Sequence, residues 1–329
     1  MSKHFFILSD DKVQNALDEF RTKEINGDDF FGRYGPGNTF PSANRPFERF
    51  ADYQLLLEKM EAIDKEKFAR THKGTAFFFL FWTAYDCGFY EKALFYLDAA
   101  ISENVLIAPH SWHKRQSAKY LWLNEAPDKA AGRAVEHTKG LLKEQLDRFN
   151  SIAGVKTVTL DDFIEKFVRK LVMKTANGRA EGRTIVTALY TYLAEAEQRY
   201  KELKLRSRGG GSTELPLKHL FKGGLIFESL LKECYPALQN GMLGTIFKDP
   251  NFRNDFPGEI STKATKLETI RLITSPDDRL TAFNVTSQLR NTTGHNLVWD
   301  DVFSNPDNFR RFVEQQVNAI LCIAGAKFL

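Results

Sequence analysis

Apolar side chains recur at helical spacing along almost the whole chain, and this periodicity restricts its fold more than any other feature. Val13, Leu17 and Phe20 follow one another at intervals of four and three residues, and later segments repeat the pattern. Strand signals are scarce, because only residues 155–159 alternate and that stretch is short. The pattern predicts an all-α protein, and 329 residues are enough for two hydrophobic cores.

The expected helices are separated by turns rich in glycine, proline and polar residues. Residues 26–47 contain many such residues and are predicted to form a long loop. A helix start is expected at residues 159–161, and a short helix at 267–273. Longer helices are expected over residues 12–23, 50–67, 75–86, 90–102, 128–149, 181–205, 217–235, 278–297 and 308–324.

The clearest break in the helical pattern is residues 206–213, which read RSRGGGST. Three consecutive glycines disfavour a helix, because each loses much backbone freedom on folding. We therefore expect a linker or a mobile loop here, and place the domain boundary at it. This gives an N-terminal helical domain over residues 1–205, a linker over 206–213, and a C-terminal bundle of four or five helices over 214–329.

Composition and charge narrow the classes of protein. The most apolar run, residues 76–84, is far shorter than the roughly 20 residues of a membrane span, and the N-terminus does not resemble a signal peptide. Cys87, Cys234 and Cys322 are far apart and odd in number, which predicts neither disulfides nor a zinc site, but small buried side chains. We expect a cytoplasmic protein without membrane contact. Its net charge of +4 permits a nucleic-acid partner without requiring one.

One stretch in the N-terminal part, residues 79–103, reads FLFWTAYDCGFYEKALFYLDAAISE. It resembles a single tetratricopeptide unit, with Gly88 at the turn and Ala93, Leu94 and Ala100 packing the second helix. The resemblance implies an α-solenoid-like domain that senses or regulates, with a regulatory protein or ligand as its partner. An ordinary antiparallel helix pair is the alternative, because stable arrays need about three units.

The segment with the clearest chemistry, residues 280–299, reads LTAFNVTSQLRNTTGHNLVW and separates Arg290 from His295 by four residues. It follows the expected helix LPLKHLFKGGLIFESLLKEC at residues 215–234. Together these segments resemble the HEPN family, over about residues 216–328. The resemblance implies a metal-independent endoribonuclease without a cofactor that acts on RNA as a homodimer through its C-terminal bundle. It further implies products with a cyclic phosphate and a 5′-hydroxyl, and a role in toxin or antiviral defence systems.

The residue types of this motif suit that chemistry, and the candidate catalytic residues are Arg290, Asn291 and His295. Histidine exchanges protons near neutral pH, and arginine offers a bidentate fork to a phosphate. Asn291 would hydrogen-bond the phosphate or fix the imidazole tautomer. Five positions along an ideal helix leave Arg290 and His295 roughly 140° apart. Either Gly294 bends or ends the helix, or two copies of the motif meet in a dimer.

Simpler interpretations remain open. Arg290 would then pair with a neighbouring acid, His295 would be an ordinary helix residue, and the bundle would serve as a non-catalytic dimerisation or nucleotide-binding unit beside a protein-binding domain. Residues 32–39 are rich in glycine but lack the Gly-Lys-Ser/Thr of a phosphate loop. His110 and His113 lack further ligands nearby in the sequence and predict a polar loop rather than a metal site.

Overall fold

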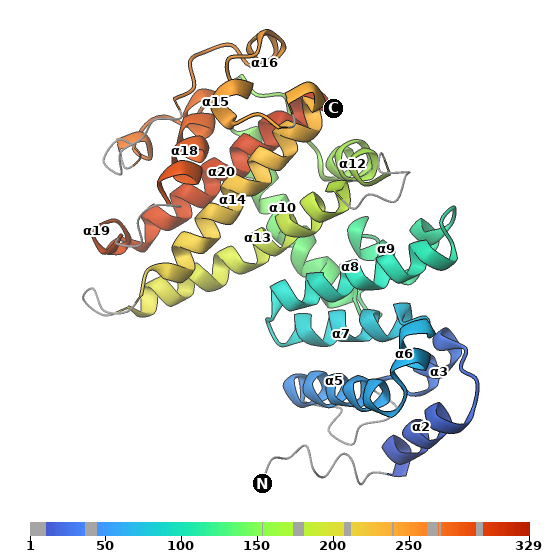
Figure 1. Ribbon diagram of the computed structural model, residues 1–329. Coiled ribbons are helices and arrows are strands. Elements are labelled where there is room, and N and C mark those ends of the chain that lie inside the picture. The colour runs from blue at the N-terminus through green and yellow to red at the C-terminus, as the bar shows by residue number, and fades with distance from the viewer. Residues whose placement is uncertain are drawn as a thin grey trace. The chain divides into compact units, whose positions relative to one another are not determined.

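The computed structural model of this chain is helical in every part that it describes (Figure 1). It describes residues 11–36, 45–152, 154–173, 181–206, 212–238, 240–261, 269, 271–293 and 299–329. No strand occurs within these ranges, so the predicted all-α class is confirmed. None of their helices is both long and apolar enough to cross a membrane. The chain divides into two compact units, residues 1–136 and 137–329.

The first unit is a succession of packed helices. Helix α2 packs on α5, both α3 and α5 pack on α7, and α7 packs on α8. These elements are α2 (Asp11–Thr22), α3 (Gly27–Arg33), α5 (Pro46–Ile63), α6 (Lys65–Arg70), α7 (Gly74–Asp86), α8 (Tyr90–Ile107), the 3-10 turn η1 (Trp112–Lys114) and α9 (Gln116–Leu121).

Helices α7 and α8 form the antiparallel pair that the sequence predicts. Gly88 has a φ of 75° at the turn, a conformation that glycine adopts without strain. Ala93 and Ala100 are fully buried, and their small side chains let the two helices approach closely. This helix pair is confirmed, whereas its assignment to a solenoid stays a prediction.

Two predictions in the first unit are wrong. Residues 26–47 are not a loop throughout, because α3 lies within them: the Asn26 side chain accepts a hydrogen bond from the Asp29 amide, and Phe30 and Phe31 are buried. The expected helix over 50–67 is two helices. Asp64 ends α5 and caps α6 by accepting a hydrogen bond of 2.9 Å from the Lys67 amide, which starts a new helix direction.

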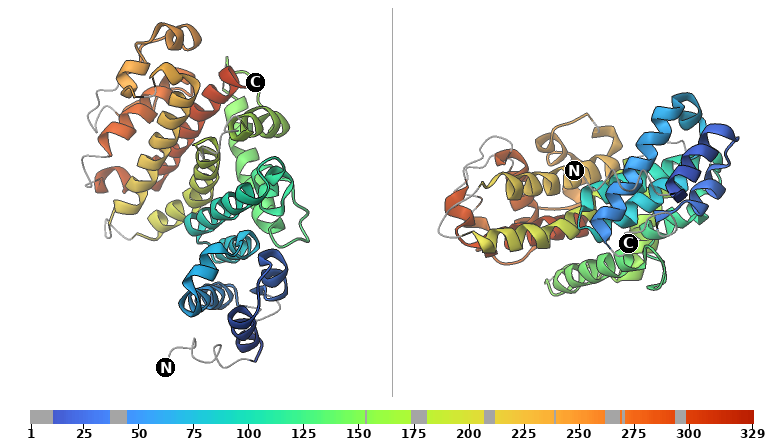
Figure 2. Two further views of the ribbon diagram at one scale, coloured as in Figure 1. Left: turned by 45° about the vertical axis from the view of Figure 1, so that its right-hand side comes forward. Right: turned by 90° about the horizontal axis from the view of Figure 1, so that it is seen from below.

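The second unit is built around α14, which packs against α13, α18 and α20 (Figure 2). Helices α13 and α18 also pack on α20. The elements are α10 (Gly132–Asn150, which begins in the first unit), α11 (Leu160–Asp162), the π-helical turn η2 (Phe163–Val168), α12 (Arg169–Met173), α13 (Glu181–Leu205), α14 (Glu214–Cys234), the 3-10 turn η3 (Pro236–Leu238), α15 (Leu243–Ile246), α16 (Pro250–Asp255), α18 (Arg279–Thr292), α19 (Asp300–Phe303) and α20 (Pro306–Lys327).

Two adjacent glycines of α14 allow this close packing. A Cβ atom on Gly223 would lie 2.5 Å from the Gln316 side chain of α20 and 2.9 Å from the Tyr192 ring of α13. A Cβ atom on Gly224 would lie 2.7 Å from Cβ and 3.0 Å from Cα of Arg290 on α18. Real Cβ atoms rarely approach other atoms so closely, so the three neighbouring helices depend on glycine at both positions.

The division into units differs from the predicted domain boundary at residues 206–213. Helix α13 precedes that boundary but packs on α14 and α20, which follow it. The Tyr192 hydroxyl of α13 donates a hydrogen bond of 2.5 Å to Gln316 Oε1, and Gln316 donates one of 2.7 Å to the Leu220 carbonyl. Helix α13 therefore shares its core with the second unit, and the chain divides between Glu136 and His137 instead.

Candidate functional site

Helix α18 carries the first half of the predicted motif. It begins at Asp278, whose carboxylate accepts a hydrogen bond of 2.6 Å from the Thr281 amide, as expected of an acid at a helix start. Phe283 and Leu289 lie on its apolar face and are buried. The helix ends at Thr292, five residues before the predicted end, and the Thr293 amide and hydroxyl both bond to the Leu289 carbonyl.

The end of α18 bears on the geometry of the motif. Helix α18 ends at Thr292, whereas the separation of roughly 140° assumes one continuous helix from Arg290 through His295. Asn291 is half-buried in the last turn of α18. Gly294 and His295 lie outside the described residues. The predicted contact between the Arg290 guanidinium and the His295 imidazole therefore lies outside them as well.

Arg290 is held in place from helix α14. Its Nε donates a hydrogen bond of 2.9 Å to Glu228 Oε2, and its Cζ lies 5.2 Å from the centre of the Phe221 ring. The Arg290 side chain is 30% exposed. Among the described residues, Glu228 is its single ion-pair partner, so the two terminal nitrogens of the fork remain for an anion. The arginine is oriented before any ligand binds.

Glu228 is shared between two cations. Its Oε1 accepts a hydrogen bond of 2.7 Å from Lys232, one helical turn later, while its Oε2 is bound to Arg290. Burial alone would raise the pKa of Glu228, but the hydrogen bonds from Lys232 and Arg290 outweigh it, and the pKa is lowered. The carboxylate is therefore ionised at neutral pH, and the three side chains together carry one positive charge.

Sequence reasoning predicted Arg290 but missed the residues that orient it. Glu228 and Lys232 stand four residues apart in a helix that is otherwise mostly apolar, which is a recognisable signal for an ion pair on one helix face. Nothing in the sequence links this pair to Arg290, which lies 62 residues further along the chain. Phe221 reads as a core residue by its spacing, although it is half-buried and carries the guanidinium.

A second polar cluster lies on the opposite side of α14, at its contact with α13. The His219 ring is buried and stacks on the Tyr192 ring at 4.2 Å, with an angle of 8° between the ring planes. Its Nδ1 lies 3.8 Å from Glu195 Oε2, beyond hydrogen-bond distance, whereas Lys222 Nζ lies 3.2 Å from the same oxygen. Burial lowers the pKa of His219, and Glu195 opposes that effect. The imidazole is therefore neutral in the core at neutral pH.

The other sequence candidates are placed as follows. His113 lies in the short turn η1 and His110 in the turn before it, and no group of three or more His, Cys, Asp or Glu side chains in the described ranges could hold a metal ion. Cys322 is buried as predicted, and burial raises its pKa to about 12. Cys87 and Cys234 are only half-buried, which corrects the prediction for these two.

At this site, the Arg290 guanidinium is fixed by an acid and an aromatic ring near the end of α18. The predicted histidine follows α18 in the sequence. Such a cation suits recognition of a phosphate. Comparisons of this chain with family models, with curated proteins and with solved structures found no match.

Proposed function

We propose that the second unit is a metal-independent endoribonuclease of the HEPN type, with Arg290, Asn291 and His295 as its catalytic residues. The observation that carries the proposal is the orientation of Arg290. Its Nε is bound to Glu228 and its Cζ lies against Phe221, while the side chain stays partly exposed. A phosphodiester would bind to the two terminal nitrogens of this fork without displacing Glu228.

The proposed reaction is an internal transfer at phosphorus. The ribose 2′-oxygen attacks the adjacent phosphorus and loses its proton, the bond from phosphorus to the 5′-oxygen breaks, and the leaving oxygen takes up a proton. The products are a cyclic phosphate and a 5′-hydroxyl. His295 exchanges one of the two protons, Arg290 stabilises the charge that develops on the phosphate oxygens, and Asn291 orients the phosphate or the imidazole.

Pairing of two second units is part of the proposal. Leu225 is 40% exposed and lies one helical turn from Phe221, on the face of α14 that also carries Glu228. With the half-buried Phe221 beside it, Leu225 places apolar surface next to the charged site, where a partner could bury it. We propose that a second copy covers this face, and that a Leu225→Glu variant is monomeric under conditions in which the wild type is dimeric.

The first unit would regulate this activity. Phe47 and Phe95 are 58% and 66% exposed, and Lys92 lies within 6 Å of the Phe89 ring centre. An aromatic surface with a cation beside it suits a protein or peptide ligand. Regulation of a toxic nuclease by such a ligand would fit a toxin or defence system. Growth arrest on overexpression, relieved by Arg290→Ala, is the expected cellular phenotype.

The test of the proposed function is cleavage of a labelled single-stranded RNA in the presence of a chelator. We expect wild-type protein to leave cyclic-phosphate ends, and both Arg290→Ala and His295→Ala to lose at least about 100-fold in rate. Arg169→Ala is the matched control, because Arg169 is an exposed arginine of α12 that pairs with Glu165, one turn earlier. Equal rates for wild type and both site variants would refute the catalytic assignment.

A non-catalytic role is the second candidate, and one observation favours it. The carboxylate of Glu228 already pairs with Arg290, as an acid would in a purely structural ion pair. In that case wild-type protein would pair through α14 but would not cleave RNA, and Arg290→Ala would lower stability without changing any activity.

A further inference from the structure

A groove in the second unit lies between helices α10, α13 and α20, away from the residues that surround Arg290. Its volume is about 490 Å³, within the usual range for small-molecule sites. Its walls combine apolar side chains with charged ones and one tyrosine. The lining residues are Leu141, Glu144, Gln145, Arg148, Leu193, Ala196, Glu197, Tyr200, Lys201, Lys204, Phe309, Arg310, Val313 and Glu314.

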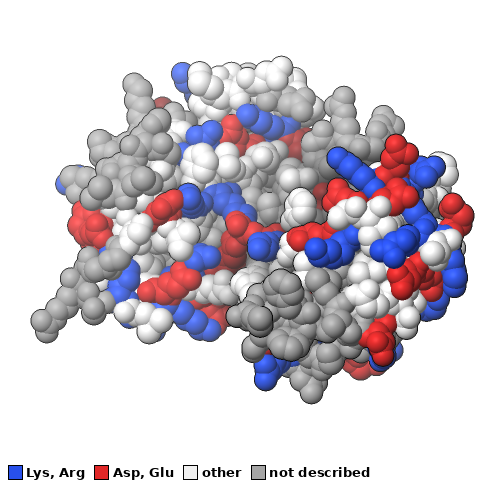
Figure 3. Space-filling view, turned by 60° about the horizontal axis from the view of Figure 1, so that its bottom comes forward, with Lys and Arg blue, Asp and Glu red and all other residues white. Residues whose placement is uncertain are grey.

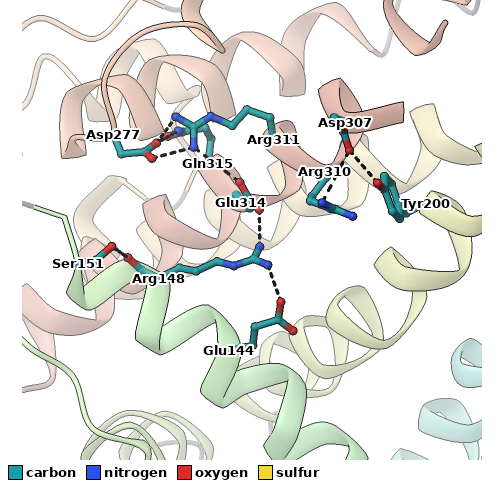
Figure 4. Close-up of polar contacts among 10 residues, drawn as sticks. All are labelled: Glu144, Arg148, Ser151, Tyr200, Asp277, Asp307, Arg310, Arg311, Glu314 and Gln315. Carbon is teal, nitrogen blue, oxygen red and sulfur yellow. Dashed lines mark hydrogen bonds and ion pairs between the residues drawn. The ribbon is translucent and has the colours of Figure 1, made fainter. Parts of the chain in front are cut away.

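Two cations of this groove stand over one aromatic ring. The Cζ atom of Arg310 lies 4.0 Å from the centre of the Tyr200 ring, and Lys204 Nζ lies 4.8 Å from it. The Tyr200 hydroxyl donates a hydrogen bond of 2.7 Å to Asp307, which fixes the ring (Figure 4). Two like charges therefore lie within about 5 Å of the centre of one ring that lines the groove, an arrangement that an anion would stabilise.

The other cations of the groove are already neutralised. Arg148 binds both Glu144 and Glu314, and these three lie apart from Tyr200 and Arg310 in Figure 4. Lys201 pairs with Glu197 at 2.5 Å. Figure 3 shows basic and acidic side chains interspersed over the described residues of one face. No broad basic surface is seen among the described residues there, so an anion would be attracted by a local excess of positive charge.

Lys204 and Arg310 carry the least neutralised charges of the lining. Within the described ranges Lys204 has no acid within ion-pair distance, and the nearest acid to Arg310 is Asp307, at 3.7 Å. Asp307 is also bound to the Tyr200 hydroxyl, so its charge is shared between two partners. The pair therefore provides two cationic donors with free hydrogen-bonding capacity.

From this geometry we infer that Lys204 and Arg310 bind the phosphate of an organic phosphate of nucleotide size, either a free nucleotide or one unit of an RNA chain. The phosphate lies between the two cations at the edge of the Tyr200 ring. The apolar part of the lining, which includes Leu193 and Val313, receives the sugar and base. This site shares no lining residue with the surroundings of Arg290 and does not depend on the proposed cleavage reaction.

The test compares the binding of three probes, AMP, adenosine and a short fluorescein-labelled single-stranded RNA, by calorimetry and fluorescence anisotropy. We expect a Lys204→Ala/Arg310→Ala double variant to bind AMP at least about tenfold more weakly than wild type. Adenosine should bind wild type weakly, since it lacks the phosphate. Lys201→Ala is the matched control, because its charge is already paired, and it should stay within about twofold of wild type.

The outcomes separate the two sources of the phosphate. Loss of AMP binding in the double variant identifies a free nucleotide, whereas loss of RNA binding in a protein that never binds AMP identifies an RNA chain. If the double variant does not fold, single Lys204→Gln and Arg310→Gln variants take its place. The inference is overturned if wild type binds neither AMP nor RNA, or if removing the two cations leaves binding of both unchanged. AMP binding that depends on Arg290 and not on this pair also overturns it.

Discussion

Arg290 Nε and Glu228 Oε2 lie 2.9 Å apart, and this hydrogen bond fixes the end of α18 to the middle of α14. The Glu228 side chain is only 13% exposed, so its ionised form depends on its two cationic partners. Loss of the negative charge would leave Arg290 and Lys232 facing each other without compensation.

A Glu228→Gln variant tests the contribution of this charge to stability. We expect its free energy of unfolding to be about 1–2 kcal/mol lower than that of wild type near neutral pH. Because folding lowers the pKa of Glu228, the stabilisation is present above the ordinary value of 4.5 and is lost as the pH falls through the folded-state pKa. Urea unfolding at neutral and at acid pH measures the difference.

A control for that experiment is Glu165→Gln, since Glu165 is exposed and pairs with Arg169 one turn away. It should change stability by less than about 0.5 kcal/mol. An equal loss for Glu165→Gln and Glu228→Gln would contradict a special role of the Glu228 carboxylate.

Gly224→Ala tests the close approach of α14 and α18. The added methyl group would lie 2.7 Å from Arg290 Cβ and 3.0 Å from its Cα, atoms that move only with the helix itself. We expect a loss of about 1–3 kcal/mol in thermal or urea unfolding, and a shift of Arg290 relative to Glu228.

Gly140→Ala provides the matched control in helix α10. A Cβ atom at Gly140 meets nothing within 4 Å, so the substitution should stabilise the helix by about 0.5–1 kcal/mol. If both alanine variants unfold at the same denaturant concentration as wild type, the packing argument for Gly224 is wrong.

His219 predicts a dependence of stability on pH. Burial lowers its pKa below the ordinary value of 6.5 in the folded chain, so between the two values the unfolded chain binds more protons. The free energy of unfolding should therefore decrease as the pH falls below about 6.5, because protons bind to the exposed imidazole of the unfolded chain more readily than to the buried one. Unfolding curves recorded across this range measure the slope.

A His219→Phe variant keeps an aromatic ring against Tyr192 and should reduce that slope. A residual slope is expected, because burial also lowers the pKa of His137. An unchanged slope in His219→Phe would show that His219 does not titrate in this range.

Gln316 tests the hydrogen bonds that join three helices. Gln316→Leu removes the acceptor of the Tyr192 hydroxyl and the donor to the Leu220 carbonyl, both of them buried. We expect a loss of about 2–4 kcal/mol, because two buried polar groups lose their partners. In the double variant with Tyr192→Phe the loss should be smaller than the sum of the two single losses, and strict additivity would exclude coupling.

The helices were largely predictable from the sequence, and their ends were less so. Helix α13 has the predicted bounds, because its apolar stripe is long and unbroken. Helix α3 escaped prediction, because glycine, asparagine and aspartate at residues 26–29 are typical of loops as well as of helix starts. Helix α18 ends early, at two consecutive threonines that precede Gly294.

Arg290 could be predicted as a site residue, but its environment could not. A motif gives the residue types and their spacing along one segment, whereas Glu228 and Phe221 come from another helix. The same limit applies to Arg310 of α20, which the contact of α13 with α20 brings to Tyr200 and Lys204, one turn apart on α13. Contacts between helices follow from packing, which a periodic pattern does not specify.

Because Gly223 and Gly224 have no side chains, the backbone of α14 itself sets how closely the neighbouring helices approach at these two positions. Substitution with residues of increasing size would separate α14 from its neighbours in steps, from glycine to alanine to serine. Position 224 would change the distance to α18, and position 223 the distances to α13 and α20. These two neighbouring positions therefore give separate control over the two faces of one helix.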